Sequence, residues 1–514
     1  MISELRPSSP LPPAPASFNM AQYVLQHAAR LGGKIALEIV SADTLPNARW
    51  TYAQLERAVL GVATGLLDQG LQPGDRVLLR LGNTVDFPLG FLGAIAAGLV
   101  PIPSSSQLTG SEITRMAKLV TPSLIIAEPG IALPDPAPCS VIETKTLHGF
   151  TDLSPAAYHQ GCPERPAYII FTSGTSGQAR AVLHAHRAIW ARQMMWDGWY
   201  GITENDRVMH AGAFNWTYTL GTGLMDPWSV GATALIPAAG NTPNDLSALL
   251  SRENVSIFAA APGVYRQILK ATLPTLPHLR HGLSAGEKLP EITRTRWEEQ
   301  THTPIHEAFG MSECSTFISG SPSKPAPDGA LGFGQTGRHL AVLDRSGSPV
   351  PVGTTGTLAI HRSDPGLMLE YLNAPEATAD KFLSDWFLTG DSVSMTQAGA
   401  FIYDGRGDDI MNAGGYRVSP IEVETAMTLH PGISEAACIE ISVKADASVI
   451  GCFYIPSDAP IAEEELTRHA HSLLAHYKCP RLFRAVNALP RSTNNKLSRA
   501  ALRRLIVAND TKNK

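Results

Sequence analysis

The segment FTSGTSGQARAV (Phe171 to Val182) combines residue types that can bind phosphate. Glycines let the backbone come close to a ligand, and successive N–H groups can surround anionic oxygens. Hydroxyl groups donate hydrogen bonds to phosphate oxygens, and Arg180 adds a forked positive charge. The hydroxyl and glycine positions of this loop are Thr172, Ser173, Gly174, Thr175, Ser176 and Gly177.

A loop of this composition could also be a simple Ser/Thr/Gly linker, so its flanks decide between the two interpretations. The apolar run AYII precedes the loop and predicts a buried strand, and HAHRAIWA follows it. The spacing differs from G-x-x-x-x-G-K-[ST], which excludes a Walker A loop. A strand followed by a glycine-rich loop favours a phosphate site.

The loop resembles the phosphate loop of the adenylate-forming superfamily, which includes acyl-CoA synthetases, peptide-synthetase adenylation domains and luciferases. The pattern of that superfamily is [YF]-T-S-G-[TS]-[TS]-G-x-P-K-G. Here Ala179, Arg180 and Ala181 replace its proline, lysine and last glycine. Arginine keeps the positive charge but is bulkier and forked, so the phosphate contact differs in detail.

Three further motifs follow in the order of the superfamily. LSAGEKLP (283–290) is similar to its adenine-side loop, and EAFGMSEC (307–314) to its [YF]-G-x-[TS]-E motif. WFLTGD (386–391) is similar to its ribose motif. The resemblance implies nucleotide contacts at Gly286, Glu287, Glu307, Ala308, Phe309 and Gly310, with Ser312 toward the α-phosphate, Glu313 as a ligand of Mg²⁺ and Asp391 on the ribose hydroxyls.

Two motifs lie near the C-terminus. YDGRGDDIMNAGGYRVSPIEVE (403–424) is similar to the hinge region of the superfamily, and LPRSTNNKL (489–497) to its P-R-x-x-x-x-K motif, with Asn495 in place of the usual glycine. The resemblance implies a pivot at Asp408, ribose and phosphate contacts at Arg406 and Arg417, a path for the CoA thiol at Gly414 and Gly415, and a catalytic lysine at Lys496.

The chemistry that the resemblance implies needs charge neutralisation. A carboxylate attacks the α-phosphorus of ATP, and because both partners are anionic, Mg²⁺, Arg180, Lys496 and the loop hydroxyls must offset their repulsion. Plain structural roles remain open for several of these residues. Lys496, Arg406 and Arg417 could be surface residues, Asp391 a turn residue and Glu313 a helix cap. Glu287 and Glu307 could merely frame the adenine.

The segment AGAFNWTYTLGTGLMDPW (Ala211 to Trp228) is a candidate wall of the acyl pocket. Phe214, Trp216 and Tyr218 fall at alternate positions, which would place them on one face of an extended segment. Flat rings would make a short apolar pocket for an aromatic or compact acid. An aromatic core strand is the alternative, and the segment is similar to the F-x-Y-x-L-G run of benzoate-CoA ligases. No cation is evident there, and His210 could be a core residue or a substrate contact.

The elements that must position these residues alternate between strand-like and helix-like segments, as in DRVLLRL (75–81), a helix near 90–98 and SLIIAE (123–128). This order predicts an α/β fold with a parallel sheet, followed by a small β-rich region after about residue 334. The polar, glycine-rich stretch 405–420 predicts a boundary. We expect a large N-terminal AMP-binding domain, residues 1–407, and a small mobile α+β lid, residues 408–514.

Composition excludes several classes. The chain has 514 residues, 44% hydrophobic and 17% charged, so it can bury a core, and its net charge of −5 argues against a dedicated nucleic-acid binder. Six cysteines without a C-x-x-C pair favour a reduced, cytoplasmic protein, and the apolar run 87–103 favours a buried helix and strand over a membrane span.

The sequence therefore predicts an ATP-dependent carboxylate–CoA ligase that uses Mg²⁺ and CoA and acts on an aromatic, benzoate-like or short-to-medium acid. We expect no nucleic-acid partner and no membrane span, and a homodimer is possible. The alternatives are an adenylation enzyme that loads a carrier-protein thiol and a non-catalytic relative that binds nucleotide.

Overall fold

The computed structural model describes residues 1–42, 47–173, 179–286, 289, 291–406, 411–413, 416–418, 420–444, 447–490, 497, 499 and 502–503. The chain forms two compact units. The large unit comprises residues 1–106, 117–171 and 181–405, and the small unit takes its described residues from 107–116, 172–180 and 406–514. The boundary predicted between residues 407 and 408 lies outside the described residues.

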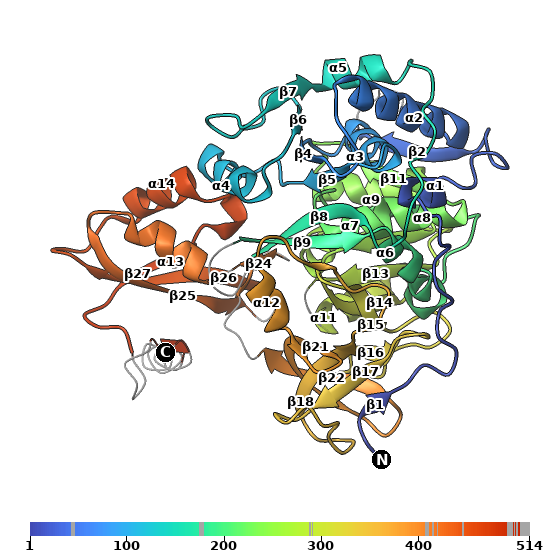
Figure 1. Ribbon diagram of the computed structural model, residues 1–514. Helices are drawn as coiled ribbons and strands as arrows, with labels where there is room; N and C mark the ends of the chain where they lie inside the picture. The colour runs from blue at the N-terminus through green and yellow to red at the C-terminus, as the bar shows by residue number, and fades with distance from the viewer. Residues whose placement is uncertain are drawn as a thin grey trace. The chain divides into compact units, whose positions relative to one another are not determined.

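A mixed sheet of fifteen described strands runs through the large unit (Figure 1). Its central strands β2, β11, β10, β12, β13 and β14 pair in parallel, and the strands beyond β14 pair antiparallel. In order across the sheet the strands are β1 (Glu4–Leu5), β17 (Leu340–Leu343), β18 (Gly356–His361), β21 (Trp386–Met395), β22 (Ala400–Arg406), β16 (Gly332–Gly334), β15 (Ser315–Ser319), β14 (Ile305–Met311), β13 (His281–Ala285), β12 (Ile257–Ala260), β10 (Arg207–His210), β11 (Thr233–Pro237), β2 (Ile35–Val40) and β3 (Ala48–Thr51), with β20 (Phe382–Leu383) beside β21.

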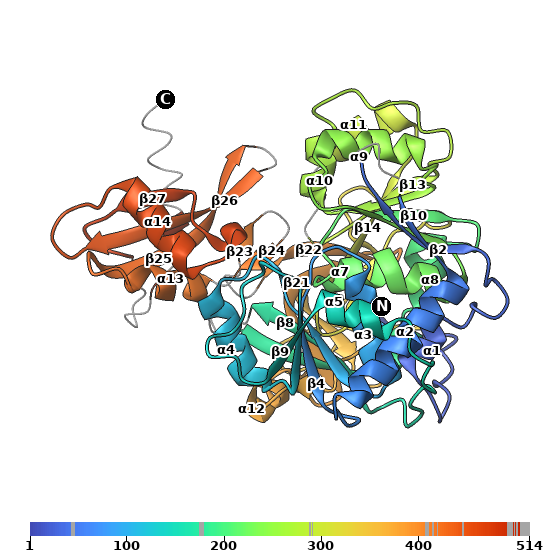
Figure 2. The same ribbon diagram turned by 90° about the horizontal axis from the view of Figure 1, so that it is seen from above.

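Helices cover the parallel part of this sheet. The central strands are short and their residues are almost all buried, as expected for strands covered on both faces. Helices α9 (Pro243–Arg252), α10 (Pro262–Ile268) and α11 (Glu291–Thr301) lie together beside them (Figure 2). The ring of Tyr265 packs edge-on against Phe258 and Trp297, with centroids 5.2 and 4.9 Å apart. This packing joins β12, α10 and α11 beside β13 and β14, the strands whose ends carry two of the nucleotide motifs.

A second sheet in the large unit confirms the alternation read from residues 75–128. Its parallel strands lie in the order β5 (Val100–Pro103), β4 (Arg76–Arg80), β6 (Leu124–Ala127) and β7 (Ser140–Glu143). Helix α3 (Asp86–Ala96) carries the apolar run, and all its residues are buried, with α2 (Tyr52–Asp68) packed against it. Among the described residues, no helix is both long and apolar enough to cross a membrane.

A third, three-stranded sheet leads into the predicted phosphate loop. Its order is β19 (Glu370–Tyr371), β9 (Ala179–Ala185) and β8 (Pro166–Ser173). Residues 174–178, which connect β8 to β9, lie outside the described residues. The strand predicted before the loop is therefore present as β8.

The small unit contains a three-stranded sheet of β25 (Ile433–Lys444), β26 (Ala447–Pro456) and β27 (Leu482–Ala485). Helices α13 (Pro420–Thr428) and α14 (Glu463–Leu473) lie against one another beside it (Figure 1). The small unit also contains the pair β23 (Met411–Ala413) and β24 (Tyr416–Val418), the 3-10 helix His476–Lys478 and the first part of α4 (Gly110–Val120). A large mixed α/β part and a small α+β part confirm the predicted fold class.

Candidate active site

The turn between β14 and β15 carries Ser312 and Glu313, the sixth and seventh residues of the EAFGMSEC motif. The two strands form an antiparallel pair whose register shifts between Phe309 and Gly310. A Cβ atom on Gly310 would lie 2.2 Å from the carbonyl oxygen of Ser315. Only glycine allows the backbones to approach so closely, and this approach sets the turn that presents Glu313.

Glu313 is held by a tyrosine from the third sheet. The side chain of Tyr371 donates a hydrogen bond to Oε1 of Glu313 over 2.6 Å, and the Met368 N–H donates to the Glu313 carbonyl oxygen over 2.7 Å. Glu313 is only 6% exposed, so its carboxylate is both desolvated and oriented.

A single oriented carboxylate is compatible with Mg²⁺, which proteins usually bind through one or two carboxylates plus substrate phosphates. Within the part of the chain that the structure describes, no group of three or more His, Cys, Asp or Glu side chains could hold a metal ion by itself. A Mg²⁺ at Glu313 would therefore take its other ligands from nucleotide and water.

A connected group of three side chains lies on the large sheet. It consists of Phe309 in β14, Tyr403 in β22 and Asp391 in β21. The rings of Phe309 and Tyr403 lie 5.8 Å apart, and the Tyr403 hydroxyl donates to Oδ1 of Asp391 over 3.4 Å. Asp391 lies in β21 and is 4% exposed, and its N–H donates to the Thr389 hydroxyl. The residues predicted for adenine and for ribose are thus brought together by Tyr403, which sequence reasoning did not single out.

Glu307 is engaged by the protein itself. The Leu289 N–H donates to its Oε1 over 3.1 Å, and Arg294 lies 3.3 Å from its Oε2. These contacts tie the loop after β13 and helix α11 to β14. Gly286, which begins that loop, has φ +99°, a conformation that favours glycine. Glu307 therefore has a structural role in this loop, and its contact with adenine stays a prediction.

The structure describes the other predicted residues to different extents. Thr172 and Arg180 are half-buried on β8 and β9. Ser173, Arg406 and Arg417 are described by their backbone alone, in β8, β22 and β24. The predicted residues outside the described part of the chain are Gly174, Thr175, Ser176, Gly177, Glu287, Asp408, Gly414, Gly415 and Lys496.

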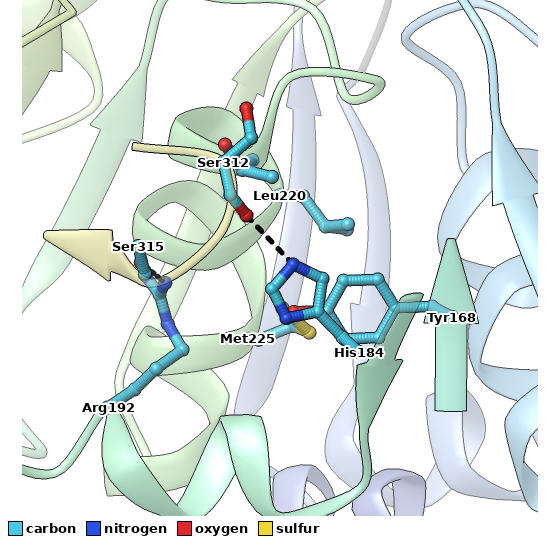
Figure 3. A pocket seen from close by; sticks show the side chains of 8 residues that line it. Tyr168, His184, Arg192, Leu220, Met225, Ser312 and Ser315 are labelled. Carbon is cyan, nitrogen blue, oxygen red and sulfur yellow. Dashed lines mark hydrogen bonds between the residues drawn. The ribbon is translucent and has the colours of Figure 1, made fainter. Parts of the chain in front are cut away.

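A small, partly enclosed pocket lies against Ser312 in the large unit (Figure 3). It is lined by residues from the strands before and after the phosphate loop, from the end of helix α6 (Arg187–Ala191), from the predicted acyl segment and from the β14–β15 turn. These residues are Tyr168, His184, Arg192, Thr217, Leu220, Met225, Ser312 and Ser315. Ser312 therefore belongs both to a nucleotide motif and to the wall of this pocket.

The aromatic residues predicted for the acyl pocket do not share one face. Their segment is not extended: it turns into helix α7 (Thr217–Leu220) and the π-helical turn Gly221–Met225. Phe214 packs on Phe87, at 5.1 Å between centroids, whereas Tyr218 packs on Trp199 and donates to the Leu283 carbonyl oxygen. The alternation of the rings predicts one face of an extended segment, and this prediction is wrong. The helix instead turns Thr217 and Leu220 toward the pocket. The ring of Trp216 lies edge-on to that of Tyr218.

A charged cluster lies beside the pocket, where the sequence showed no cation. Arg192 contacts Asp226 through Nε at 2.8 Å and through Nη2 at 2.5 Å, and both side chains are buried. Tyr200 donates to Asp226 over 2.7 Å. Burial alone would lower the pKa of Arg192, but Asp226 outweighs it and the pKa is raised, so the guanidinium stays charged. The sequence signal for this pair was Asp226 itself, a carboxylate inside the apolar run GLMDPW that needed a partner.

Two histidines near the site are buried and neutral. Burial lowers the pKa of His184 to about 4 and that of His210 to about 3. His184 contacts the Ser312 carbonyl oxygen through Nε2 at 2.8 Å, whereas neither ring nitrogen of His210 has a hydrogen-bond partner in the described part of the chain. His210 packs edge-on against Tyr218, with ring centroids 4.4 Å apart. This packing is that of a core residue, one of the two roles that the sequence left open for His210.

This arrangement, with a nucleotide motif beside a small pocket in one unit and a separate α+β unit, is that of an adenylate-forming enzyme. The model of the AMP-binding enzyme family matches residues 24–372, and that of the AMP-binding enzyme C-terminal domain matches residues 422–496. The chain therefore belongs to the AMP-binding enzyme family.

Relatives with printed activities are similar over nearly the whole chain. Benzoate–CoA ligase of Thauera aromatica is 31% identical over 487 residues, which cover 88% of this chain and 90% of that protein. The mitochondrial acyl-coenzyme A synthetase ACSM2A of Homo sapiens is 28% identical, covering 95% and 91%. The structure of a benzoate CoA ligase from Burkholderia xenovorans LB400 matches with TM-score 0.70 and 28% identity, over 95% of this chain and 100% of that one.

These matches confirm the predicted superfamily and the predicted class of enzyme, an AMP-forming acid–thiol ligase that uses ATP and CoA. The carrier-protein and non-catalytic alternatives gain no support from them.

Proposed function

We propose that the enzyme activates an aromatic, benzoate-like or short-to-medium carboxylic acid as acyl-AMP and then forms its CoA thioester. The observation that carries this proposal is Ser312, which lines the small pocket and directly precedes Glu313. An acid in or near that pocket would have its carboxylate close to the residues predicted for the α-phosphate and Mg²⁺.

In the first step, a carboxylate oxygen attacks the α-phosphorus of ATP and pyrophosphate leaves. Tyr371 orients the Glu313 carboxylate, which would hold Mg²⁺, and the ion would offset the charge on the phosphates. Asp391 would accept hydrogen bonds from the ribose, and Phe309 would lie against the adenine. Lys496 would bridge the attacking carboxylate and the α-phosphate, while the loop hydroxyls and Arg180 would hold the departing pyrophosphate.

In the second step, the CoA sulfur attacks the acyl carbonyl and AMP leaves with the bonding electrons. We propose that the small unit turns about Asp408 between the steps, so that Lys496 leaves and Gly414 and Gly415 line the path of the thiol. Glycine suits this place because it leaves room for a pantetheine arm.

The range of acids rests on the relatives and on the pocket. One relative is a benzoate–CoA ligase and another a 3-hydroxybenzoate–CoA ligase, at 31% and 27% identity. A small pocket beside Ser312 favours compact acids over long chains. A cytoplasmic location and a homodimer stay predictions from the sequence.

Replacing Lys496 tests the proposed division of labour. We expect Lys496→Ala to lower the rate of acyl-AMP formation at least about a hundredfold, because the cation that bridges two anions is lost. The same variant should still convert supplied acyl-AMP and CoA to the thioester, since Lys496 has left by then. Pyrophosphate release and thioester formation measure the two half-reactions.

The matched control is Lys270→Ala, which removes an exposed lysine of the large unit. It should leave both half-reactions unchanged. If Lys496→Ala forms acyl-AMP at the rate of the unaltered enzyme, or loses both half-reactions equally, the proposed role of Lys496 is wrong.

A further inference from the structure

One wall of the pocket offers a bare hydrogen-bond acceptor. The only proton that neutral His184 carries must lie on Nε2, because that nitrogen faces the Ser312 carbonyl oxygen at 2.8 Å. Its Nδ1 is then an acceptor, and it is buried without a hydrogen-bond partner among the residues that the structure describes. Stacking on Tyr168, at 4.8 Å between ring centroids, keeps the ring in this orientation. A buried acceptor without a donor is costly, so at a pocket wall it is suited to accept a hydrogen bond from a group that enters the pocket, either a water or a ligand hydroxyl.

A second wall offers a donor. Nη1 of Arg192 donates to the Ser315 hydroxyl oxygen, so the Ser315 proton is free to point elsewhere. Figure 3 shows the Arg192 side chain ending beside Ser315, with His184 across the pocket from them. Gly221 makes room for the guanidinium, because a Cβ atom there would lie 2.0 Å from Nη2 of Arg192.

The charge of the pocket is balanced. Arg192 lines the pocket and pairs with Asp226, which is not itself part of the lining, and both side chains are buried, so the charge of Arg192 is already compensated. A second carboxylate placed here would add an uncompensated buried charge beside Asp226, which is unfavourable. A neutral group that both donates and accepts would satisfy His184 and Ser315 together.

We propose that this pocket binds a hydroxyl group of the acid substrate, with His184 accepting its proton and Ser315 donating to its oxygen. The enzyme then selects a hydroxylated acid over the same acid without the hydroxyl. This inference rests on the proposed function, because the pocket is assigned to the acid. A site that hydrogen-bonds a substrate hydroxyl discriminates strongly against an analogue that lacks it, since its own polar groups are then left unpaired.

The test compares benzoate, the three hydroxybenzoates and the corresponding fluorobenzoates, which match the hydroxyl in size but donate no proton. We expect one hydroxybenzoate isomer to exceed benzoate and its fluoro analogue in kcat/KM at least about tenfold. In Ser315→Ala that ratio should fall about tenfold. Ser321→Ala, which removes a buried hydroxyl outside the pocket lining, should leave the ratio unchanged.

Calorimetric binding of the same acids separates this inference from the proposed function. Tighter binding of one hydroxybenzoate that Ser315→Ala abolishes supports the hydroxyl site even if no acid is activated, in which case the proposed function alone fails. Equal kcat/KM and equal binding for all the acids, or a preference that survives Ser315→Ala, would overturn the inference. The pocket would then hold a structural water only.

Discussion

The side chains that place the reactive groups come from segments far away in the sequence. Glu313 is oriented by Tyr371, 58 residues later, and Arg192 is balanced by Asp226, 34 residues later. Motif spacing was sufficient to single out Glu313, Ser312 and Asp391. It could not single out Tyr371 or His184, because their roles arise from partners that meet only in the folded chain.

Removing the Tyr371 hydroxyl should affect catalysis more than stability. In Tyr371→Phe the Glu313 carboxylate loses its donor, and a hydrogen bond to a charged group contributes about 1.5–3 kcal/mol. We expect kcat/KM for acyl-AMP formation to fall roughly tenfold or more, with a raised requirement for Mg²⁺. Pyrophosphate release at varied Mg²⁺ concentration measures both.

Tyr158→Phe is the matched control, because Tyr158 donates to Glu56 over 3.0 Å in the same unit but outside the site. It should leave the Mg²⁺ requirement unchanged. Equal kinetic effects of the two substitutions would show that Tyr371 does not act through Glu313.

At the scale of elements, a buried ion pair joins the segment before β17 to the segment after β18 and contacts β15. Arg338, just before β17, contacts Asp364, after β18, at 2.6 Å, and both side chains are 0% exposed. Arg338 also donates to the Thr316 carbonyl oxygen in β15, and Asp364 accepts from the Gly366 N–H. The pair therefore supports the turn that carries Glu313.

Breaking this pair should destabilise the large unit. Asp364→Asn leaves the Arg338 charge uncompensated in the core, which costs about 3–5 kcal/mol. Denaturant unfolding followed by tryptophan fluorescence measures this loss in the free energy of unfolding of the large unit, because all 8 tryptophans lie in that unit. Asp385→Asn removes the partner of Arg362 in an exposed pair and should change stability little. A similar midpoint for both variants would contradict this account.

Periodicity predicted many elements but failed at the acyl segment. The strand and helix predictions for residues 75–128 match β4, α3 and β6, because burial on one or both faces leaves a clear pattern. In residues 214–218 the alternating aromatic rings belong to two different core clusters, one around Phe87 and one around Trp199. Tertiary packing, which no local pattern shows, decided that segment.

At the scale of the whole molecule, the order of the motifs was sufficient to predict the fold class, since it assigned each motif to a place in a known architecture. The phosphate-binding role of the loop, the hinge and the catalytic lysine stay predictions, because they depend on residues outside the described part of the chain. The sequence did not predict which charged and histidine side chains are buried in the large unit, such as the pairs Arg192–Asp226 and Arg338–Asp364.

That buried chemistry makes stability depend on pH. Burial lowers the pKa of His184, His281 and His306 to about 4 and that of His186 and His210 to about 3, from 6.5. Below about pH 6.5 the unfolded chain binds these protons and the folded chain does not, so the free energy of unfolding falls as pH falls. Each histidine contributes roughly 1.4 kcal/mol per pH unit in that range.

Unfolding measured from pH 7.5 to 5.5 should therefore show a loss of several kcal/mol. His210→Phe should make the slope shallower, whereas His278→Gln, at an exposed position, should not. Constant stability over this range would show that the folded protein takes up these protons as readily as the unfolded chain, so that burial does not lower the histidine pKa values.

The central claim is that this chain joins a carboxylic acid to CoA through an acyl-adenylate. The most direct measurement incubates the enzyme with ATP, Mg²⁺ and a panel of benzoates and C4–C10 fatty acids, with and without CoA, and detects the products by mass spectrometry. The account predicts enzyme-bound acyl-AMP and pyrophosphate without CoA, and free acyl-CoA and AMP once CoA is added. ADP and phosphate in place of AMP and pyrophosphate, or acyl-AMP that CoA does not consume, would contradict it.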